Sequence, residues 1–172
     1  MASLGEDNLR YFCMHPVHAP FPATRLRRTR VSPAMRALVR ENALEVGDLI
    51  WPIFVRAGEG IVEPVASMPG VMRRSVDKVL EAAAEADALG IGAICVFPYT
   101  GLEDRTEDCA GAWDPQNPAN RAIAAIKQAY PHIAVMSDVA LDTYNINGHD
   151  GFVEDGIIVN DRTVEALVKM AL

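Results

Sequence analysis

The chain has 172 residues, of which 50% are hydrophobic and 23% are charged, and its formal net charge at pH 7 is −7. This composition is typical of a soluble globular domain and excludes a chain that is disordered over most of its length. No run approaches the roughly 20 apolar residues of a membrane-spanning helix, and the N-terminus has no apolar segment of the kind found in signal peptides. We therefore expect a cytoplasmic protein without a membrane partner.

The three cysteines also indicate a reducing compartment. Cys13, Cys95 and Cys109 are odd in number and form no C-x-x-C pair. This spacing predicts reduced thiols rather than a disulfide framework or a structural zinc site.

Charge is unevenly distributed along the chain. Residues 1–40 carry seven arginines and two acidic residues, whereas the remainder holds nine basic and 21 acidic residues. A basic arm can bind nucleic acid, but this one lacks the interleaved aromatic residues that stack on bases, so we expect no nucleic-acid partner. We expect the arm to pack against an acidic surface of its own or of a neighbouring subunit.

The arm itself is predicted to be extended, with one short helix. Its first 24 residues contain three prolines and show no helical or strand periodicity. Ser32 and Pro33 then form a typical helix start, because serine accepts backbone hydrogen bonds at the N-cap and proline suits the first helical position. We therefore assign residues 1–40 to the arm and residues 41–172 to a folded body.

In the body, three apolar runs predict strands, and an amphipathic helix follows each of them. The predicted strands are 49–55, 91–97 and 132–139, and Pro98 ends the second of them. The predicted helices start at Ser75, at Asn117-Pro118 and at Asn160 or Asp161. Gly90 ends the first helix and Pro131 ends the second. Pro52, inside the first run, indicates a strand edge or a bulge. Val164, Leu167, Val168 and Ala171 form the apolar stripe of the last helix.

This alternation predicts right-handed βαβ units and a parallel sheet, either an α/β barrel or an open doubly wound sheet. A complete eight-stranded barrel needs roughly 250 residues, and only three units are visible. We therefore expect part of a fold, with unpaired strand edges that favour aggregation or poor folding of the isolated chain.

The loop after the third predicted strand carries the richest set of chemical groups. Asp138, Asp142, His149 and Asp150 lie within thirteen residues, at a strand end where active sites of parallel α/β folds are found. They supply acids, bases and hard oxygen ligands, and neighbouring carboxylates raise one another's pKa. The alternative is that the aspartates bond to loop amides and that residues 149–151 form a turn. The sequence leaves both interpretations open.

Six collinear motifs resemble those of the porphobilinogen synthase (5-aminolevulinate dehydratase) family. They are Arg25-Leu-Arg-Arg28, Ser32-Pro-Ala-Met-Arg36, Pro52-Ile-Phe-Val55, Ser67-Met-Pro-Gly-Val71, Ser137-Asp-Val-Ala-Leu-Asp142 and Gly148-His-Asp-Gly151. The resemblance covers residues 25–172 of this chain and corresponds to the N-terminal half of family members. It implies a (β/α)8 TIM barrel, of which this chain holds the arm and about three βα units, and a homo-oligomer, usually an octamer, in which the arm wraps a neighbouring subunit.

The resemblance also implies a hydro-lyase that condenses two 5-aminolevulinate molecules to porphobilinogen, with loss of two waters, in tetrapyrrole and haem biosynthesis. Family chemistry needs two lysines that form Schiff bases with the substrate. The chain has only Lys78, Lys127 and Lys169, all within helical patterns. We therefore expect the Schiff-base lysines and the substrate-binding arginines beyond Leu172, and a chain that is incomplete and inactive by itself.

The resemblance further bears on metal binding. Zinc-dependent members have cysteines where this chain has Ala140, Asp142 and Asp150, and carboxylates favour hard ions over zinc. We expect no catalytic zinc, and either Mg²⁺, K⁺ or no metal. The predicted sites are Asp138 as an active-site carboxylate and Asp142 and Asp150 as metal-binding groups.

Two alternatives stay open from the sequence. The chain can be a non-catalytic interaction subunit that docks onto a full-length relative, or a different α/β enzyme with a carboxylate metal site.

Overall fold

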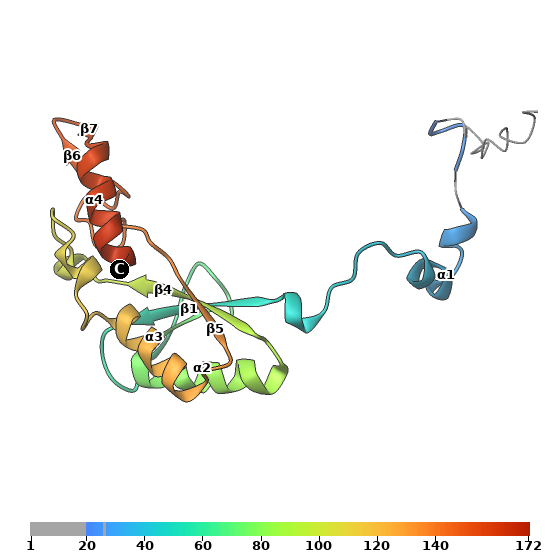
Figure 1. Cartoon of the computed structure of the whole chain (residues 1–172), viewed down its shortest axis with the longest axis horizontal. Coiled ribbons are helices and arrows are strands. Elements are labelled where there is room, and N and C mark those ends of the chain that lie inside the picture. The colour runs from blue at the N-terminus through green and yellow to red at the C-terminus, as the bar shows by residue number, and fades with distance from the viewer. Residues whose placement is uncertain (1–19, 26) are drawn as a thin grey trace, which may run out of the picture. The chain divides into compact units, whose positions relative to one another are not determined.

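The computed structural model describes residues 20–25 and 27–172, so the predictions for Cys13 and for the first 19 residues lie outside the described residues. The chain divides into two compact units, Met1–Ala43 and Leu44–Leu172 (Figure 1). In the described part, every helix is too short or too polar to cross a lipid bilayer.

The described residues of the first unit form two short helices, and the second unit contains an α/β fold. The arm holds the 3-10 helix η1 (Arg28–Arg30) and α1 (Pro33–Leu38). The body strands are β1 (Ile50–Arg56), β2 (Val62–Pro64), β3 (Met72–Ser75), β4 (Ala93–Tyr99), β5 (Ala134–Ser137), β6 (Val153–Glu154) and β7 (Ile157–Ile158). Its helices are α2 (Val76–Leu89), α3 (Pro118–Ala129) and α4 (Asn160–Ala171), with 3-10 turns η2 (Val46–Asp48), η3 (Leu102–Asp104) and η4 (Ala110–Trp113).

The main sheet has the strand order β2-β3-β1-β4-β5. The three strands predicted from the sequence, β1, β4 and β5, are neighbours and run parallel, as do β1 and β3. Only β2 runs antiparallel, to β3. The predicted parallel sheet of consecutive βα units is therefore confirmed.

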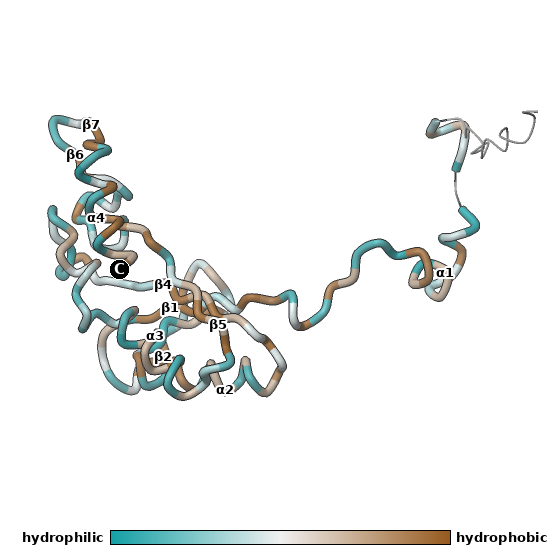
Figure 2. The backbone as a smooth tube through the Cα atoms, in the orientation of Figure 1, coloured by the Kyte–Doolittle hydropathy of each residue, from teal (hydrophilic) through white to brown (hydrophobic). Residues whose placement is uncertain are grey.

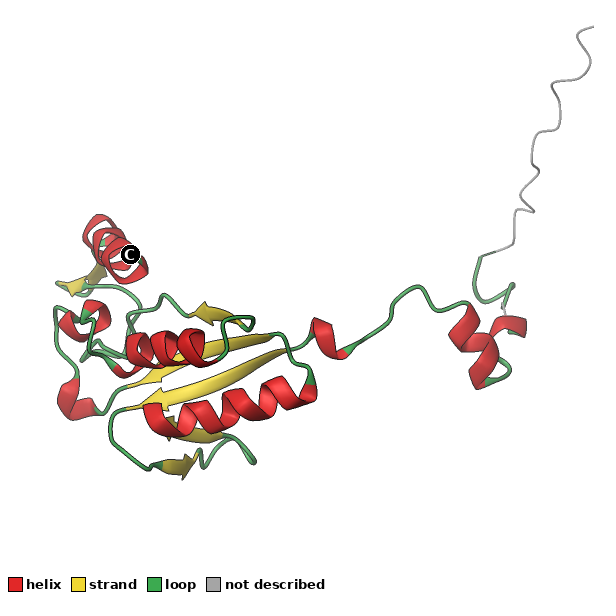
Figure 3. Ribbon diagram, turned by 60° about the horizontal axis from the view of Figure 1, so that its bottom comes forward, coloured by secondary structure: helices red, strands yellow, loops and turns green. Residues whose placement is uncertain are grey.

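One face of this sheet is buried under helices. Ile53 and Val55 of β1 and Ile94 and Val96 of β4 are at most 3% exposed and form one core cluster with residues of α2 and α3. Both helices lie on the same side of the strands (Figures 1 and 3). Hydrophobic residues lie along β1 and β5 (Figure 2). Burial of alternate strand residues is what a sheet covered on one face requires.

Pro52 in β1 and Pro98 in β4 behave differently from each other. Pro52 lies opposite Cys95 of β4, and the pairing of β1 with β3 starts only at Phe54. The N–H that proline lacks is therefore not needed for hydrogen bonds between β1 and β3. Pro98 was predicted to end its strand, and this prediction is wrong, because β4 continues to Tyr99. β5 pairs with β4 only as far as Val96, so Pro98 occupies a stretch with one open side.

The helix starts agree with the sequence, with one correction. Ser32 and Asn117 accept hydrogen bonds from the backbone N–H groups of Met35 and Asn120, as N-caps do. Gly90 ends α2 in the left-handed region, at φ 77°. Ser75 precedes α2, but its hydroxyl accepts a bond from the N–H of Ile61 rather than capping the helix. The side chain therefore ties the loop after β1 to β3.

Three other features differ from the predictions. β5 is shorter than predicted, and β2, β3, β6 and β7 were not predicted, because strands of two to four residues carry too little periodicity. In α4 the buried residues are Thr163 and Ala166. Val164 and Val168, which belong to the predicted stripe, are 47% and 53% exposed.

The Asn117 side chain allows a stability test. It accepts the N–H of Asn120 at 2.8 Å and donates to the carbonyls of Gly111 and Ala112 at 3.0 and 3.2 Å. Asn117→Ala should lower the free energy of unfolding by about 2–3 kcal/mol, because a cap and two further hydrogen bonds are lost. Asn160→Ala, at an exposed position, should change it by less than about 0.5 kcal/mol. Urea unfolding followed by tryptophan fluorescence measures both, and equal losses would contradict the assignment.

Candidate functional site

The candidate site lies at the carboxyl edge of the sheet, which we define as the ends of β1, β4 and β5 with their following loops. The parallel register brings Arg56 opposite Tyr99 and Val96 opposite Ser137. The next residue after β5 is Asp138, which lies beside β4 because its N–H reaches the carbonyl of Val96 at 3.5 Å. The loops 100–117 and 138–152 follow this edge (Figure 1). The sequence-based placement of Asp138 at a strand end is consistent with this geometry.

Asp138 is a carboxyl group at this edge whose pKa is raised. It is half-buried, and its pKa is raised first by burial and then by the negative charges of Asp142 and Asp150. The fold thus brings the three predicted aspartates close enough for their charges to interact. A carboxyl group with a raised pKa is better suited to donate a proton near neutral pH than an exposed one.

Asp150 also has a structural role in the loop. Its carboxylate accepts the backbone N–H of Asp142 at 3.3 Å. The Asn145 side chain is 1% exposed, donates to the carbonyl of Gly151 and accepts the N–H of Asn147. Gly148 has φ 62°, which glycine adopts without strain. In this loop Asp150 therefore fixes a backbone amide, and its charge and that of Asp142 act on Asp138.

The loops after β4 and β5 are joined by hydrogen bonds that the sequence did not reveal. The Arg105 guanidinium donates to the carbonyls of Thr100 and Asp142. Thr106 donates its N–H to the carbonyl of Tyr144 at 3.0 Å, and Thr143 Oγ1 donates to the carbonyl of Pro98 at 3.3 Å. These contacts position the aspartate-bearing loop relative to β4.

A second group of side chains at this edge was also missed. Glu63 pairs with both Arg56 and Arg73, and the Arg73 guanidinium lies 4.1 Å from the centre of the Tyr99 ring. Such stacking stabilises arginine through the quadrupole of the ring. The group links the β2–β3 hairpin to β1 and β4. These residues are too far apart in sequence for a motif, and only the register of β1, β3 and β4 reveals their proximity.

A cavity of about 530 Å³ lies beside these groups. Arg56, Tyr99, Asn117 and Tyr144 are among the residues that line it. Tyr144 is 3% exposed, and its hydroxyl has no hydrogen-bond partner among the described residues. Burial raises the pKa of Tyr144 to about 12, so the phenol is neutral at physiological pH.

The three lysines lie on helices rather than directly after strands, as the sequence predicts. Lys78 pairs with Glu81 on α2. Lys127 on α3 donates to the carbonyls of Pro131 and Ile133. Lys169 on α4 lies 5.4 Å from the ring centre of Trp113. Each lysine therefore has a structural contact and none follows a strand.

The described residues do not show a preformed metal centre. Within 20–25 and 27–172, no three histidine, cysteine, aspartate or glutamate side chains are arranged to hold a metal ion. The two described cysteines are free, and burial raises the pKa of Cys95 and of Cys109. Raised pKa values keep these thiols protonated, which weakens them as ligands and nucleophiles.

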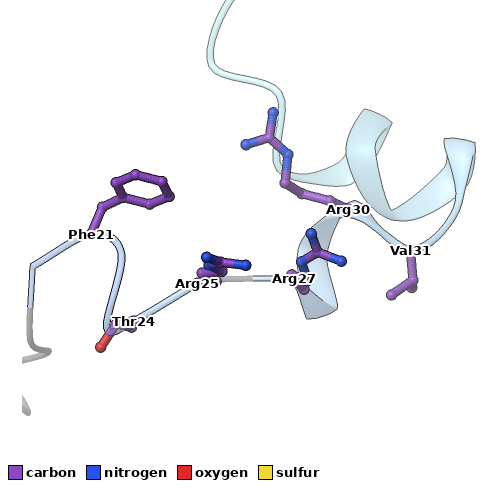
Figure 4. Close-up of a pocket in the computed structure, with 6 residues that line it drawn as sticks. All are labelled: Phe21, Thr24, Arg25, Arg27, Arg30 and Val31. Atoms are coloured by element: carbon purple, nitrogen blue, oxygen red, sulfur yellow. The ribbon is translucent and has the colours of Figure 1, made fainter.

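The arm has a cavity of its own, of about 650 Å³, lined by Phe21, Thr24, Arg25, Arg27, Arg30 and Val31 (Figure 4). The guanidinium of Arg25 lies 5.8 Å from the centre of the Phe21 ring. All six residues are in the first unit, so this cavity is separate from the carboxyl edge of the sheet.

Comparison with known proteins decides the family. The family profile described as delta-aminolevulinic acid dehydratase matches residues 23–172. The chain belongs to the delta-aminolevulinic acid dehydratase family. This confirms the resemblance drawn from the six motifs.

Relatives in this dehydratase family are considerably longer than the chain. The delta-aminolevulinic acid dehydratase of Rhodobacter capsulatus is 53% identical over 153 residues, which are 89% of this chain and 46% of the relative. That of Bradyrhizobium diazoefficiens is 47% identical over 150 residues, or 87% and 42% of the two chains. The chain thus spans less than half the length of these curated relatives.

A solved dehydratase structure confirms the fold class. The enzyme from Toxoplasma gondii ME49, crystallised with the reaction product porphobilinogen, superposes with a TM-score of 0.81 at 40% identity. The match covers 91% of this chain and 43% of that one. The predicted α/β fold, part of a TIM barrel, is therefore confirmed.

The unpartnered hydroxyl of Tyr144 gives the first test of this site. Tyr144→Phe should raise the free energy of unfolding by about 1 kcal/mol, because a buried hydroxyl without a partner costs desolvation energy. Tyr130→Phe, at the half-buried C-cap residue of α3, serves as the control. Urea unfolding measures both, and a loss of stability in Tyr144→Phe would show that the hydroxyl has a partner.

The raised pKa of Asp138 gives a second test. The folded chain holds this proton more tightly than the unfolded chain, whose value is about 3.9. The stability of the protein therefore falls as the pH rises from that value through the raised pKa, and the penalty is complete above it. Asp138→Asn removes the penalty, so the variant should gain stability relative to the parent between pH 4 and pH 7. Glu165→Gln on α4 is the control, and a pH-independent difference for Asp138→Asn would refute the assignment.

Proposed function

We propose that this chain supplies the N-terminal part of a porphobilinogen synthase barrel. The reaction is the condensation of two 5-aminolevulinate molecules to porphobilinogen, with loss of two waters, in tetrapyrrole and haem biosynthesis. The observation that carries this proposal is the family match over residues 23–172. The structure of the Toxoplasma gondii relative, which contains porphobilinogen, supports it.

Asp138 is the catalytic group that this part of the barrel contributes. Loss of water from a carbon atom needs a proton on the departing hydroxyl, and a half-buried carboxyl group with a raised pKa is suited to supply it. Asp142 and Asp150 contribute by raising that pKa. The position of Asp138 directly after β5 agrees with the location of active sites in α/β barrels.

The Schiff-base lysines lie outside this chain. Lys78, Lys127 and Lys169 are on α2, α3 and α4 and have structural contacts. A lysine forms a Schiff base only when its amine reaches the substrate carbonyl. The chain is therefore inactive alone and depends on the part of the barrel that its relatives carry after the matched region.

The site works without catalytic zinc. Ala140, Asp142 and Asp150 offer no thiolate ligand, and carboxylate oxygens select hard ions. A Mg²⁺ or K⁺ ion held by Asp142 and Asp150 would relieve the repulsion among the three aspartates, and a metal-independent reaction is the alternative. The Asp150 carboxylate that now accepts the N–H of Asp142 would supply one ligand oxygen.

The assembled enzyme is a cytoplasmic homo-oligomer held together through the basic arm, an octamer when the barrel is complete. The exposed residues of the arm support this proposal. Val31 and Leu38 are 74% and 79% exposed, and the arm surface carries several arginines. Apolar and basic side chains on one segment fit an acidic neighbouring subunit.

Borohydride trapping tests the proposed activity. This chain and a joined chain, in which Leu172 is followed by the C-terminal region of the Rhodobacter capsulatus relative, are incubated with 5-aminolevulinate. The joined chain should form porphobilinogen and show a reduced adduct by intact mass, whereas the 172-residue chain should do neither. Turnover or an adduct in the shorter chain would contradict the placement of the lysines.

In the joined chain, Asp138→Asn should lower kcat by about 10²–10⁴, the range of a lost general acid. Its Schiff-base adduct should still be trapped, because the amine and the carbonyl are untouched. Asp161→Asn, at an exposed position in the first turn of α4, is the matched control and should keep its kcat.

A further inference from the structure

The cavity of about 530 Å³ at the carboxyl edge is lined by charged groups of both signs. Arg56 lies on its wall with Tyr99, its neighbour in the register of β1 and β4. Three carboxylates from the loop after β4 also line it, those of Glu103, Asp104 and Asp114. A cavity of this size, with a few polar groups that converge on it, is typical of a binding site for a small molecule.

The Arg56 guanidinium can bind an anion. It shares Glu63 with Arg73, so that two guanidinium groups face one carboxylate and the group keeps a net positive charge. Arg56 donates through Nη1 to Glu63 and through Nε to the carbonyl of Ala57. Within the described residues its Nη2 makes no hydrogen bond. Guanidinium N–H groups form strong, charge-assisted hydrogen bonds with carboxylates.

The three loop carboxylates carry negative charge that no basic side chain offsets. None of them forms an ion pair with another described residue. Asp114 accepts only the backbone N–H of Gln116, at 2.8 Å. The Glu103 carboxylate lies so close to Gly101, which lines the cavity, that a Cβ at Gly101 would overlap with it. Unpaired carboxylates on the wall of a cavity attract an ammonium group.

Tyr144 gives an independent indication of a ligand. It lines the cavity, is 3% exposed, and its hydroxyl has no partner among the described residues. Gly111 lines the cavity too, and a Cβ there would lie 3.2 Å from Cδ1 of the Tyr144 ring, so glycine lets the ring approach the loop after β4. Buried polar groups in proteins are almost always hydrogen-bonded, and a ligand in the cavity would explain this exception.

We propose that the cavity binds a short amino acid, with its carboxylate at Arg56 and its ammonium group among the three loop carboxylates. A simple anion would meet those carboxylates, and a simple cation would meet the guanidinium, whereas a molecule with both charges satisfies both groups. The Tyr144 hydroxyl donates to an oxygen atom of the ligand. This inference goes beyond the proposed function and does not depend on it, although 5-aminolevulinate is one molecule of this class.

Isothermal titration calorimetry of the 172-residue chain tests the class of ligand. The probe is 5-aminovalerate, which has an ammonium group and a carboxylate but no keto group that could form a Schiff base. Its binding should saturate at one molecule per chain. Levulinate, which lacks the ammonium group, and pentylamine, which lacks the carboxylate, should bind at least tenfold more weakly. A parallel titration with 5-aminolevulinate shows whether the substrate of the proposed reaction or another amino acid binds more tightly.

Two variants test the place of the site. Arg56→Gln should weaken binding of 5-aminovalerate at least tenfold, whereas Arg40→Gln, at an exposed position in the arm, should leave it unchanged. Tyr144→Phe should weaken binding about fivefold, because one hydrogen bond to the ligand is lost. Tyr130→Phe, whose ring does not line the cavity, is its control.

Two sets of results would overturn the proposal. Titrations without saturable binding, or equal affinities for 5-aminovalerate and levulinate, would show that the class of ligand is wrong. An unchanged affinity in Tyr144→Phe and in Arg56→Gln would show that the site is elsewhere. Circular dichroism establishes that each variant is folded, and if Arg56→Gln fails to fold, the result for Tyr144→Phe decides.

Discussion

The parallel pairing of β1 with β4 is the constraint on which the body of this protein depends. Its register places Ile53 beside Val96 and so directs the alternate residues of both strands toward α2 and α3. The same register brings Arg56 beside Tyr99 at the carboxyl edge. A shift of β4 by one residue would turn Ile94 and Val96 away from α2 and α3 and take them out of the core. Core packing and site geometry are therefore two results of one pairing.

Two separate groups of charged side chains lie at the carboxyl edge, one of aspartates alone and one in which arginines pair with a glutamate. Asp138, half-buried near two other carboxylates, has its pKa raised, while Glu63 is matched by two arginines that lie over Tyr99. Hydrogen bonds from Arg105 and Thr143 hold the aspartate-bearing loop against the end of β4. The chain thus positions its proposed acid without the rest of the barrel. None of its three lysines directly follows a strand.

Short sequence patterns correctly predicted the features that depend on residues close together in the chain. The caps at Ser32 and Asn117, the end of α2 at Gly90 and the three parallel strands β1, β4 and β5 all follow from residue types and periodicity. The errors arose where contacts between segments far apart in the sequence determine the structure. Pro98 stays in β4 because β5 does not pair with that part of the strand, and the Ser75 hydroxyl accepts a hydrogen bond from the loop after β1. The Arg–Glu–Tyr group and the buried Tyr144 could not be predicted, because they depend on strand register and loop packing rather than on spacing.

The reactivity of Cys95 tests the central claim most directly, namely that one face of the sheet is packed under helices while the other is open. Cys95 lies between Ile94 and Val96 in β4, on the face of the sheet opposite α2 and α3, and is partly exposed, whereas Cys109 is fully buried in the cluster beneath α4. Mass-spectrometric mapping of alkylation measures both thiols, in this chain and in a joined chain that carries the C-terminal barrel region. We predict that Cys95 reacts in the 172-residue chain, faster than Cys109, and becomes protected in the joined chain. Protection of Cys95 in the shorter chain, equal to that of Cys109, would contradict the account.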